Sequence, residues 1–255
     1  MKDNIQNIES KIDEGARHLY SRYTSTSALA GFDSDVMLHW SIDYFNLNFA
    51  KYIPESRNAN ILEIGCGYGK NIIALKELGY VNVSGIDLSE EQVDFAKSKL
   101  KLNDIECIDV FEYLSKNNQK FDCILLIDVI EHFDLTALIK LGIMLEECLT
   151  DSGKLIIQVP NDLSPMNPIR SGDLTHIRAF TPQSLNQYIT SSNMKIIDVS
   201  ETQIPIRGIV QLIRKLIWKM FLRPVLNFIF SILHGKYAFN KVFTANLICI
   251  AHKAK

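Results

Sequence analysis

Short apolar runs alternate with helix-like segments through the middle of the chain. Five runs rich in β-branched residues predict buried strands: Ile61–Ile64, Val83–Ile86, Glu106–Ile108, Phe121–Ile127 and Lys154–Val159. Between them, apolar residues that recur every three or four positions predict three helices, Asn71–Leu78, Glu90–Leu100 and Leu135–Leu149. Strands that alternate with helices form βαβ units, in which helices cover both faces of a parallel sheet.

The flanking segments complete this pattern. Residues 1–58 have a polar, helical pattern, including an amphipathic stretch from about Asp33 to Tyr52 that ends at Pro54. Two later strands, Lys195–Val199 and Asn246–Ala251, flank a long insertion. We therefore predict one α/β domain, a doubly wound, mostly parallel seven-stranded sheet with a helical cap and a helical insertion. Its parts are the cap (1–58), the core (59–201), the insertion (202–245) and the last strand (246–255).

Composition narrows the class of protein. The 255 residues, 47% of them hydrophobic, suffice for one sizeable core but not for two full domains. The 27 basic and 29 acidic residues nearly cancel, which argues against nucleic-acid binding by bulk charge. Five cysteines without a CxxC pair indicate a reducing compartment, and the acidic start does not resemble a signal peptide. We expect a cytoplasmic protein.

The insertion has an unusual composition. From Thr202 to Lys255 the chain has nine Lys or Arg and no acidic residue, whereas the first 201 residues carry a net charge of −11. Seventeen of the 25 residues from Ile209 to Leu233 are large and apolar. Because basic residues and Pro224 interrupt this stretch, we expect two helices, about 208–222 and 225–234. They would form either a contact with anionic lipid or a lid or dimer interface.

A glycine-rich turn follows the first predicted strand. Gly65, Gly67 and Gly69 form a G-x-G-x-G pattern, which allows a sharp turn and close approach to a ligand. A dinucleotide fingerprint would need glycine where Lys70 stands. Glu63, two residues before the turn, suits a cationic amino acid or sulfonium ligand better than a pyrophosphate. A tight turn without a ligand, and an NAD(P)-binding oxidoreductase, are the alternatives.

Acidic residues end the next three predicted strands. Asp87 lies about twenty residues after the glycines, where a carboxylate can accept hydrogen bonds from both ribose hydroxyls. Asp109 is placed to bind an adenine amino group, and Asp128 ends the fourth strand. The carboxyl ends of parallel strands meet at one edge, where open α/β sheets bind ligands. A lone aspartate at such a place is often a helix N-cap, but the ordered set favours a ligand site.

These motifs together resemble class I S-adenosylmethionine-dependent methyltransferases, across about residues 59–201 and from Asn246 onward. The resemblance implies that Gly65, Cys66 and Gly67 line the methionine part of S-adenosylmethionine and that Glu63 supports it. It places Asp87 on the ribose and Leu88 beside the adenine. It also assigns Asp109 and Val110 to the adenine edge and Asp128 to the neighbourhood of the methyl donor. Tyr23 is a candidate to close over the cofactor by position alone.

Two histidines follow the strands that end at this edge. For a hydroxyl acceptor, methyl transfer requires removal of the proton during attack, and the pKa of histidine suits that step. His176 and His132 are therefore the candidate bases, and Arg178 could hold an anionic acceptor. As alternatives, His176 could brace the loop before the helix cap at Thr181–Pro182, and Arg178 could be a solvated loop residue. We expect no metal site, because no tight ligand cluster appears beyond the cofactor acids.

The segment from Val159 to Leu185 is similar to stretches in bacterial methyltransferases of surface polysaccharides and their sugar precursors. It shares a pattern with quinone-type methyltransferases as well. The resemblance therefore implies O-methylation of a sugar, nucleotide sugar or glycan precursor of a capsule or lipopolysaccharide. A lipid-like acceptor such as a quinone ring is the alternative. The insertion at 202–245 would mediate a homodimer or a peripheral contact with the inner face of the membrane.

Overall fold

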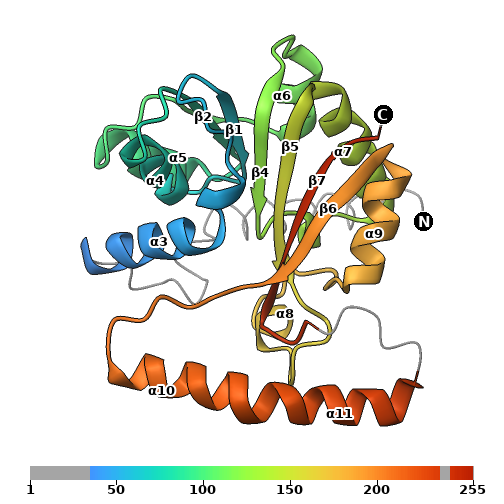
Figure 1. Ribbon diagram of the computed structural model, residues 1–255. Helices are drawn as coiled ribbons and strands as arrows, with labels where there is room; N and C mark the ends of the chain where they lie inside the picture. The colour runs from blue at the N-terminus through green and yellow to red at the C-terminus, as the bar shows by residue number, and fades with distance from the viewer. Residues whose placement is uncertain (1–34, 236–241, 255) are drawn as a thin grey trace, which may run out of the picture.

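A computed structural model describes residues 35–235 and 242–254. Its centre is a seven-stranded sheet in the order β3-β2-β1-β4-β5-β7-β6, in which only β7 runs antiparallel to its neighbours (Figure 1). The strands are β1 (Asn60–Ile64), β2 (Asn82–Asp87), β3 (Ile105–Cys107), β4 (Phe121–Ile127), β5 (Leu149–Pro160), β6 (Met194–Glu201) and β7 (Asn246–Lys253). The predicted fold class is confirmed. Tyr23 and most of the predicted cap lie outside the described residues.

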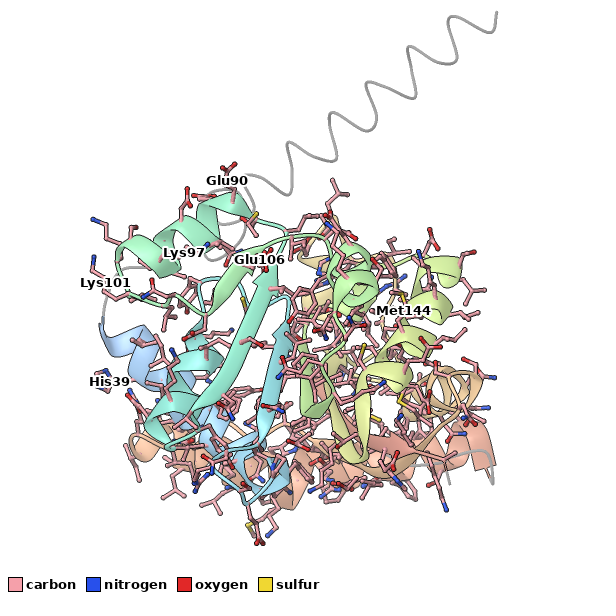
Figure 2. The ribbon with its side chains drawn as sticks, turned by 90° about the horizontal axis from the view of Figure 1, so that it is seen from above. His39, Glu90, Lys97, Lys101, Glu106 and Met144 are labelled. Carbon is pink, nitrogen blue, oxygen red and sulfur yellow. The ribbon has the colours of Figure 1, made fainter. Side chains whose placement is uncertain are left out.

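Helices cover both faces of the sheet, as the alternating pattern predicts. One face carries α3 (Asp35–Asn48), α4 (Lys70–Glu77) and α5 (Glu90–Ser98), and the other carries α6 (Val110–Lys116), α7 (Leu135–Cys148) and α9 (Pro182–Ser191). Figure 2 shows His39 of α3 and Lys97 of α5 on one side of the strands and Met144 of α7 on the other. Each face has its own apolar cluster, centred on Phe45 and Leu75 in one case and on Leu126 and Leu141 in the other.

Shorter elements lie in the connections. A 3₁₀ turn, η1 (Ala50–Tyr52), follows α3, and a second, η2 (Ile130–His132), follows β4. The one-turn helix α8 (Pro168–Ser171) lies in the long connection between β5 and α9. The predicted cap of α9 is present, since Thr181 Oγ1 accepts a hydrogen bond from the backbone N–H of Ser184. The turn η2 and the helix α8 follow the carboxyl ends of β4 and β5 and lie below the strands in Figure 1, whereas η1 leads to the amino end of β1.

The insertion differs from the prediction of two separate helices. Here α10 (Ile209–Ile217) continues through a π-helical segment, η3 (Trp218–Leu222), into α11 (Arg223–His234). Pro224 removes one backbone donor and crowds the carbonyl four residues earlier. The wider π turn just before it lets the helix continue without a break. The expectation that Pro224 ends a helix was therefore wrong.

The strand order has its switch point between β1 and β4. From β1 the chain moves outward to β2 and β3, and then returns to the other side of β1 to form β4 and β5. In open α/β sheets, connections on the two sides of such a switch point diverge, and ligands bind in the crevice between them at the carboxyl ends of the strands. Gly65 after β1 and Val129 after β4 meet there. The fold thus brings the glycine turn and the segment containing Asp128 to one place.

Candidate active site

The glycine turn after β1 has a shape that only glycine adopts easily. Gly65 and Gly67 have φ angles of +70° and +55°, in the left-handed region. A Cβ atom on Gly65 would lie 2.4 Å from Val129 Cγ2, and one on Gly67 would lie 2.6 Å from Gln92 Oε1. The Cys66 side chain is buried against Gly85, so only the backbone of Cys66 is available to a ligand.

Glu63 is buried at the end of β1 and has an unused acceptor. Its Oε1 accepts a hydrogen bond from Asn71 Nδ2, whereas its buried Oε2 has no partner among the described residues. Burial raises the pKa of Glu63 from its ordinary value of 4.5 to about 8, although the Asn71 hydrogen bond and Lys70 partly counteract the shift. A cationic ligand at this point would supply the missing donor and favour the carboxylate.

Asp87, at the end of β2, closes the turn from the other side. Its Oδ2 accepts a 2.7 Å hydrogen bond from the Gly67 N–H, and its Oδ1 accepts one of 2.8 Å from the Ser89 N–H. Each oxygen keeps a lone pair for a further donor, as binding two ribose hydroxyls would require. Burial raises the pKa of Asp87, and the backbone hydrogen bonds lower it in part. Leu88, 58% exposed, offers apolar surface next to this carboxylate.

Asp109 also has a structural task. Its Oδ1 accepts hydrogen bonds from the backbone N–H groups of Phe111 and Glu112, so it is the N-cap of α6. Val110 is buried in the core beneath it. The helix-cap alternative that the sequence raised therefore applies to this aspartate. Its part in adenine binding stays a prediction, which would rest on the carboxylate oxygen that does not cap the helix.

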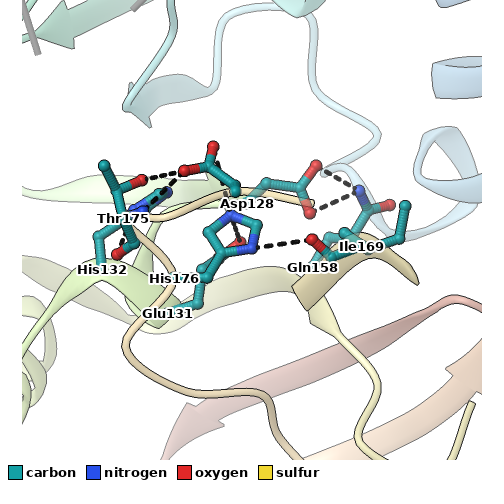
Figure 3. A network of polar contacts seen from close by, with 8 residues as sticks. Asp128, Glu131, His132, Gln158, Ile169, Thr175 and His176 are labelled. Carbon is teal, nitrogen blue, oxygen red and sulfur yellow. Dashed lines mark hydrogen bonds and ion pairs between the residues drawn. The ribbon is translucent and has the colours of Figure 1, made fainter. Parts of the chain in front are cut away.

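Asp128, after β4, belongs to a hydrogen-bond chain that the sequence did not reveal (Figure 3). Gln158 Nε2, on β5, lies 3.1 Å and 3.0 Å from the two carboxylate oxygens of Asp128 and donates to them. The Tyr44 hydroxyl, on α3, donates to Gln158 Oε1 at 2.7 Å. Asp128 has a φ of +58°, a strained conformation for a non-glycine residue. Burial raises its pKa, and the Gln158 hydrogen bonds oppose that shift.

The two candidate histidines lie together. The ring centroids of His132 and His176 are 4.8 Å apart in an edge-to-face contact, although 43 residues separate them (Figure 3). His176 Nδ1 lies 3.1 Å from the Ile169 carbonyl oxygen, and His132 Nδ1 lies 3.2 Å from the Thr175 carbonyl oxygen. Because a carbonyl only accepts, each Nδ1 carries the proton, and the basic lone pair of the neutral ring is on Nε2.

Glu131 lies under this pair and was not among the predicted site residues. His176 Nε2 is 3.8 Å from Glu131 Oε1 and 3.9 Å from Asp173 Oδ2. Burial, followed by the charge of Asp128, raises the pKa of Glu131 well above its ordinary value. Burial and the neighbouring His176 lower the pKa of His132. The surroundings therefore favour a neutral carboxyl at Glu131 and a neutral imidazole at His132.

The same cluster has the residue types of a metal site. One ligand atom from each of Glu131, His132 and His176 lies within 4.8 Å of the others. The sequence did not predict such a group, because its members come from two loops that are distant in the chain. The cluster could also act as a general base without a metal, since a neutral imidazole beside a buried carboxyl can take up a proton.

Arg178 borders the cluster through its backbone. Its N–H and that of Ile177 point to the Glu131 carbonyl oxygen, at 3.4 Å and 3.0 Å. Its side-chain Nε is buried without a hydrogen-bond partner in the described part of the chain. Arg178 thus has an unused side-chain donor, and its contact with an acceptor stays a prediction.

The site fits S-adenosylmethionine in two independent respects. The unpartnered Glu63 Oε2 is complementary to an ammonium or sulfonium charge, and the left-handed backbone at Gly65 and Gly67 forms the kind of tight turn that lets main-chain atoms approach a ligand. Asp87 adds acceptors at the distance along the chain that ribose recognition uses. The residues on the β1–β2 side therefore suit this cofactor, and the histidines on the β4–β5 side are left for an acceptor.

Comparisons with known proteins agree with this geometry. Residues 38–199 match the family model described as a methyltransferase domain. The ubiquinone biosynthesis O-methyltransferase of Coxiella burnetii is 26% identical over 168 residues, which are 59% of this chain and 70% of that protein.

Solved structures share the fold. A SAM-dependent methyltransferase from Archaeoglobus fulgidus aligns with a TM-score of 0.57 and 22% identity, over 80% of this chain and 90% of that one. The plantazolicin methyltransferase BpumL in complex with SAH aligns with a TM-score of 0.55 and 19% identity, over 97% and 99%. These neighbours show that the fold of this chain is shared. Because the family match covers well over half of the chain, the chain belongs to the methyltransferase domain family, and the predicted enzyme class is confirmed over the oxidoreductase alternative.

Proposed function

We propose that this enzyme transfers a methyl group from S-adenosylmethionine to a hydroxyl of a small-molecule acceptor, with His176 as the base. The observation that carries the proposal is the state of His176. The Ile169 carbonyl fixes the proton on Nδ1, and Nε2 faces Glu131 at 3.8 Å. An imidazole held in this way can accept a proton without first changing tautomer.

One side of the crevice would bind the cofactor, and the other would remove the proton from the acceptor. When bound, S-adenosylmethionine supplies an electrophilic methyl group. Glu63 and Asp87 hold its charged and ribose ends, and Asp128 lies next to the crevice with its carboxylate fixed by Gln158. S-adenosylmethionine would supply the methyl group for displacement by the acceptor oxygen, and His176 Nε2 would take the proton that the hydroxyl loses. Carboxyl oxygens of Glu131 and Asp173, 3.8 Å and 3.9 Å from Nε2, would then face the imidazolium N–H as acceptors.

For the acceptor, a hydroxylated ring of the quinone-precursor type is favoured over a sugar. The sequence pointed first to a glycan precursor, but none of the relatives reported above has a name connected with surface polysaccharides. One of them is named for ubiquinone biosynthesis. The exposed apolar helix α10–α11, which lies near the carboxyl edge, also suits an apolar acceptor (Figure 1). We therefore propose a cytoplasmic enzyme with access to the membrane.

Ligand binding tests the cofactor. S-adenosylhomocysteine at about 100 times its dissociation constant should stabilise the fold by roughly 2.7 kcal/mol, whereas NADH should have no effect. Asp87→Ala should abolish most of the thermal shift, because the ribose loses its acceptor. An equal shift with NADH, or an undiminished shift in the variant, would contradict the assignment.

Turnover tests the acceptor. Transfer of a labelled methyl group should be measurable with an alkyl-substituted catechol and absent with a UDP-hexose at the same concentration. The reverse preference would restore the sugar acceptor, and no transfer to any hydroxyl compound would contradict O-methylation.

A further inference from the structure

The helix from Ile209 to Leu233 is long and apolar enough to cross a membrane, and none of its most apolar window is buried in the structure. Water-exposed apolar surface on this scale usually marks a contact site. The site argued above does not account for it, because the cofactor and histidine residues all lie on other elements.

The apolar residues of this helix form one stripe. They recur at intervals of three or four residues, which places them on one side of the helix. Six members of the stripe, all exposed, are Val210, Ile213, Ile217, Phe221, Phe228 and Ile232. The partly buried positions lie on a different side and include Trp218, Arg223 and Phe230.

Contacts on that second side fix the helix to the body. Arg223 forms an ion pair with Glu201 of β6 at 3.2 Å, and Phe230 packs edge-on against Phe243 with ring centroids 5.7 Å apart. Arg207, just before the helix, pairs with Asp43 of α3. Because these contacts hold one side of the helix towards the protein, the apolar stripe points away from it.

The topology excludes a spanning orientation for this helix. Its two ends connect to β6 and β7, which are neighbouring antiparallel strands of one sheet. Both ends therefore stay on the same side of any bilayer. A helix held in this way can lie in the interface between headgroups and acyl chains, with its apolar stripe inserted.

The charges select an anionic surface. Arg214, Lys215 and Lys219 are exposed, and no carboxylate of the described residues lies within ion-pair distance of them. No acidic residue follows Glu201 in the sequence. A symmetric contact with a second copy through the stripe would bring two sets of these cations together without counter-charges, whereas anionic headgroups would neutralise them.

We propose that α10–α11 docks this enzyme on anionic lipid, with the carboxyl edge of the sheet towards the bilayer. The helix runs below that edge, and α8 lies between them (Figure 1). The loop that contains His176 also has strongly exposed apolar side chains, with Met166 99% and Leu174 92% exposed. The docking itself is independent of the proposed function. Only the inference that an acceptor enters from the lipid side rests on it.

Vesicle co-sedimentation without cofactor or acceptor tests the docking. We expect wild type to bind phosphatidylcholine vesicles containing phosphatidylglycerol, and to bind pure phosphatidylcholine far more weakly. Arg214→Gln, Lys215→Gln and Lys219→Gln together should lower the partition coefficient on the order of 100-fold, since each cation contributes roughly fivefold near such a surface. The matched control replaces Lys97, Lys99 and Lys101, on and after α5, with Gln and should bind like wild type (Figure 2).

Brominated lipids test the orientation. A tryptophan at Leu174 should be quenched on binding, whereas one at Val81, exposed at the opposite edge of the sheet, should not. The proposal is overturned if wild type ignores anionic vesicles, if the control loses binding equally, or if Val81→Trp is quenched instead. It is also overturned if sedimentation velocity shows a dimer that Phe228→Ser dissociates. Methyl transfer to a soluble catechol is measured separately, so either proposal can fail alone.

Discussion

The two sides of the crevice are built in different ways. The side at β1 and β2 comes from one stretch of 25 residues, Glu63 to Asp87, and depends largely on the shape of the backbone. The side at β4 and β5 combines residues from α3, η2, β5 and the loop before α9, and depends on side chains. The first side should therefore be sensitive to added atoms, and the second to lost functional groups.

The largest effect is expected on the side-chain half. His176→Ala should lower turnover by about 10²–10⁴-fold, the usual cost of losing a general base, because the variant lacks the imidazole that is proposed to take the proton. Binding of S-adenosylhomocysteine should stay near wild type, since Glu63, the glycine turn and Asp87 lie on or after β1 and β2 and not on the loop that contains His176. Single-turnover methyl transfer together with calorimetry measures both quantities.

His132→Ala should have a smaller effect than His176→Ala, since His132 contacts the His176 ring and would act by positioning it. Dialysis against a chelator separates a base from a metal site at the same cluster. Unchanged activity supports the base, whereas loss that zinc or magnesium restores would assign these residues to an ion. If both variants keep wild-type rates, alignment of the acceptor is the better explanation of catalysis.

On the backbone half, one added methyl group should have the next largest effect. Gly65→Ala places a Cβ 2.4 Å from Val129 Cγ2 at a φ of +70°. We expect a loss of roughly 3 kcal/mol in unfolding free energy, from left-handed strain and the collision together, and weaker cofactor binding. Gly79→Ala is the control, because its φ is +88° but its Cβ would have 3.9 Å of clearance. It should cost only about 1–2 kcal/mol. If urea unfolding gave the same loss of unfolding free energy for Gly65→Ala and Gly79→Ala, backbone strain alone would explain both effects.

The pH dependence of stability should reveal Glu63. Its pKa is about 8 in the folded protein, above its ordinary value of 4.5, so folding takes up a proton between these values. Its contribution to stability is thus fully present below about pH 4.5 and is lost as pH rises towards 8. Glu63→Gln cannot titrate and should flatten part of that slope. S-adenosylhomocysteine should bind wild type more tightly as pH approaches 8, because the ionised carboxylate suits its ammonium group. Parallel curves of unfolding free energy against pH for wild type and Glu63→Gln would contradict the raised pKa of Glu63.

The smallest effect is expected at the start of the hydrogen-bond chain to Asp128. Tyr44→Phe removes the 2.7 Å hydrogen bond to Gln158 and should cost about 1 kcal/mol, with a modest loss of turnover. Tyr80→Phe removes a similar bond, to the Pro54 carbonyl oxygen, and should cost as much without changing turnover. A difference in activity between two equally destabilised variants would assign Tyr44 to the site. Equal activity would make its role purely structural.

The sequence determined the features that are local in the chain. Short runs of β-branched apolar residues located the strands, and apolar residues every three or four positions located the helices, because burial on both faces of a covered sheet and one-sided burial of a helix leave direct marks on the sequence. The glycine turn and Asp87 were found in the same way, since a strand, its turn and the next strand end are close along the chain. Some local features were not determined by the sequence. The sequence did not show that Asp109 caps α6, or that Cys66 turns into the core.

Tertiary structure alone decided the rest. Gln158 is one polar residue in an apolar strand, Tyr44 is one aromatic on an amphipathic helix, and Glu131 is one acid in a loop. Nothing in the sequence indicates that they meet Asp128 and His176. The exposure of α10–α11 is a second example, because apolar composition is the same for a buried lid and for a surface helix. Contacts between distant segments depend on how sheet and helices pack, and packing is a property of the whole fold that no single segment encodes.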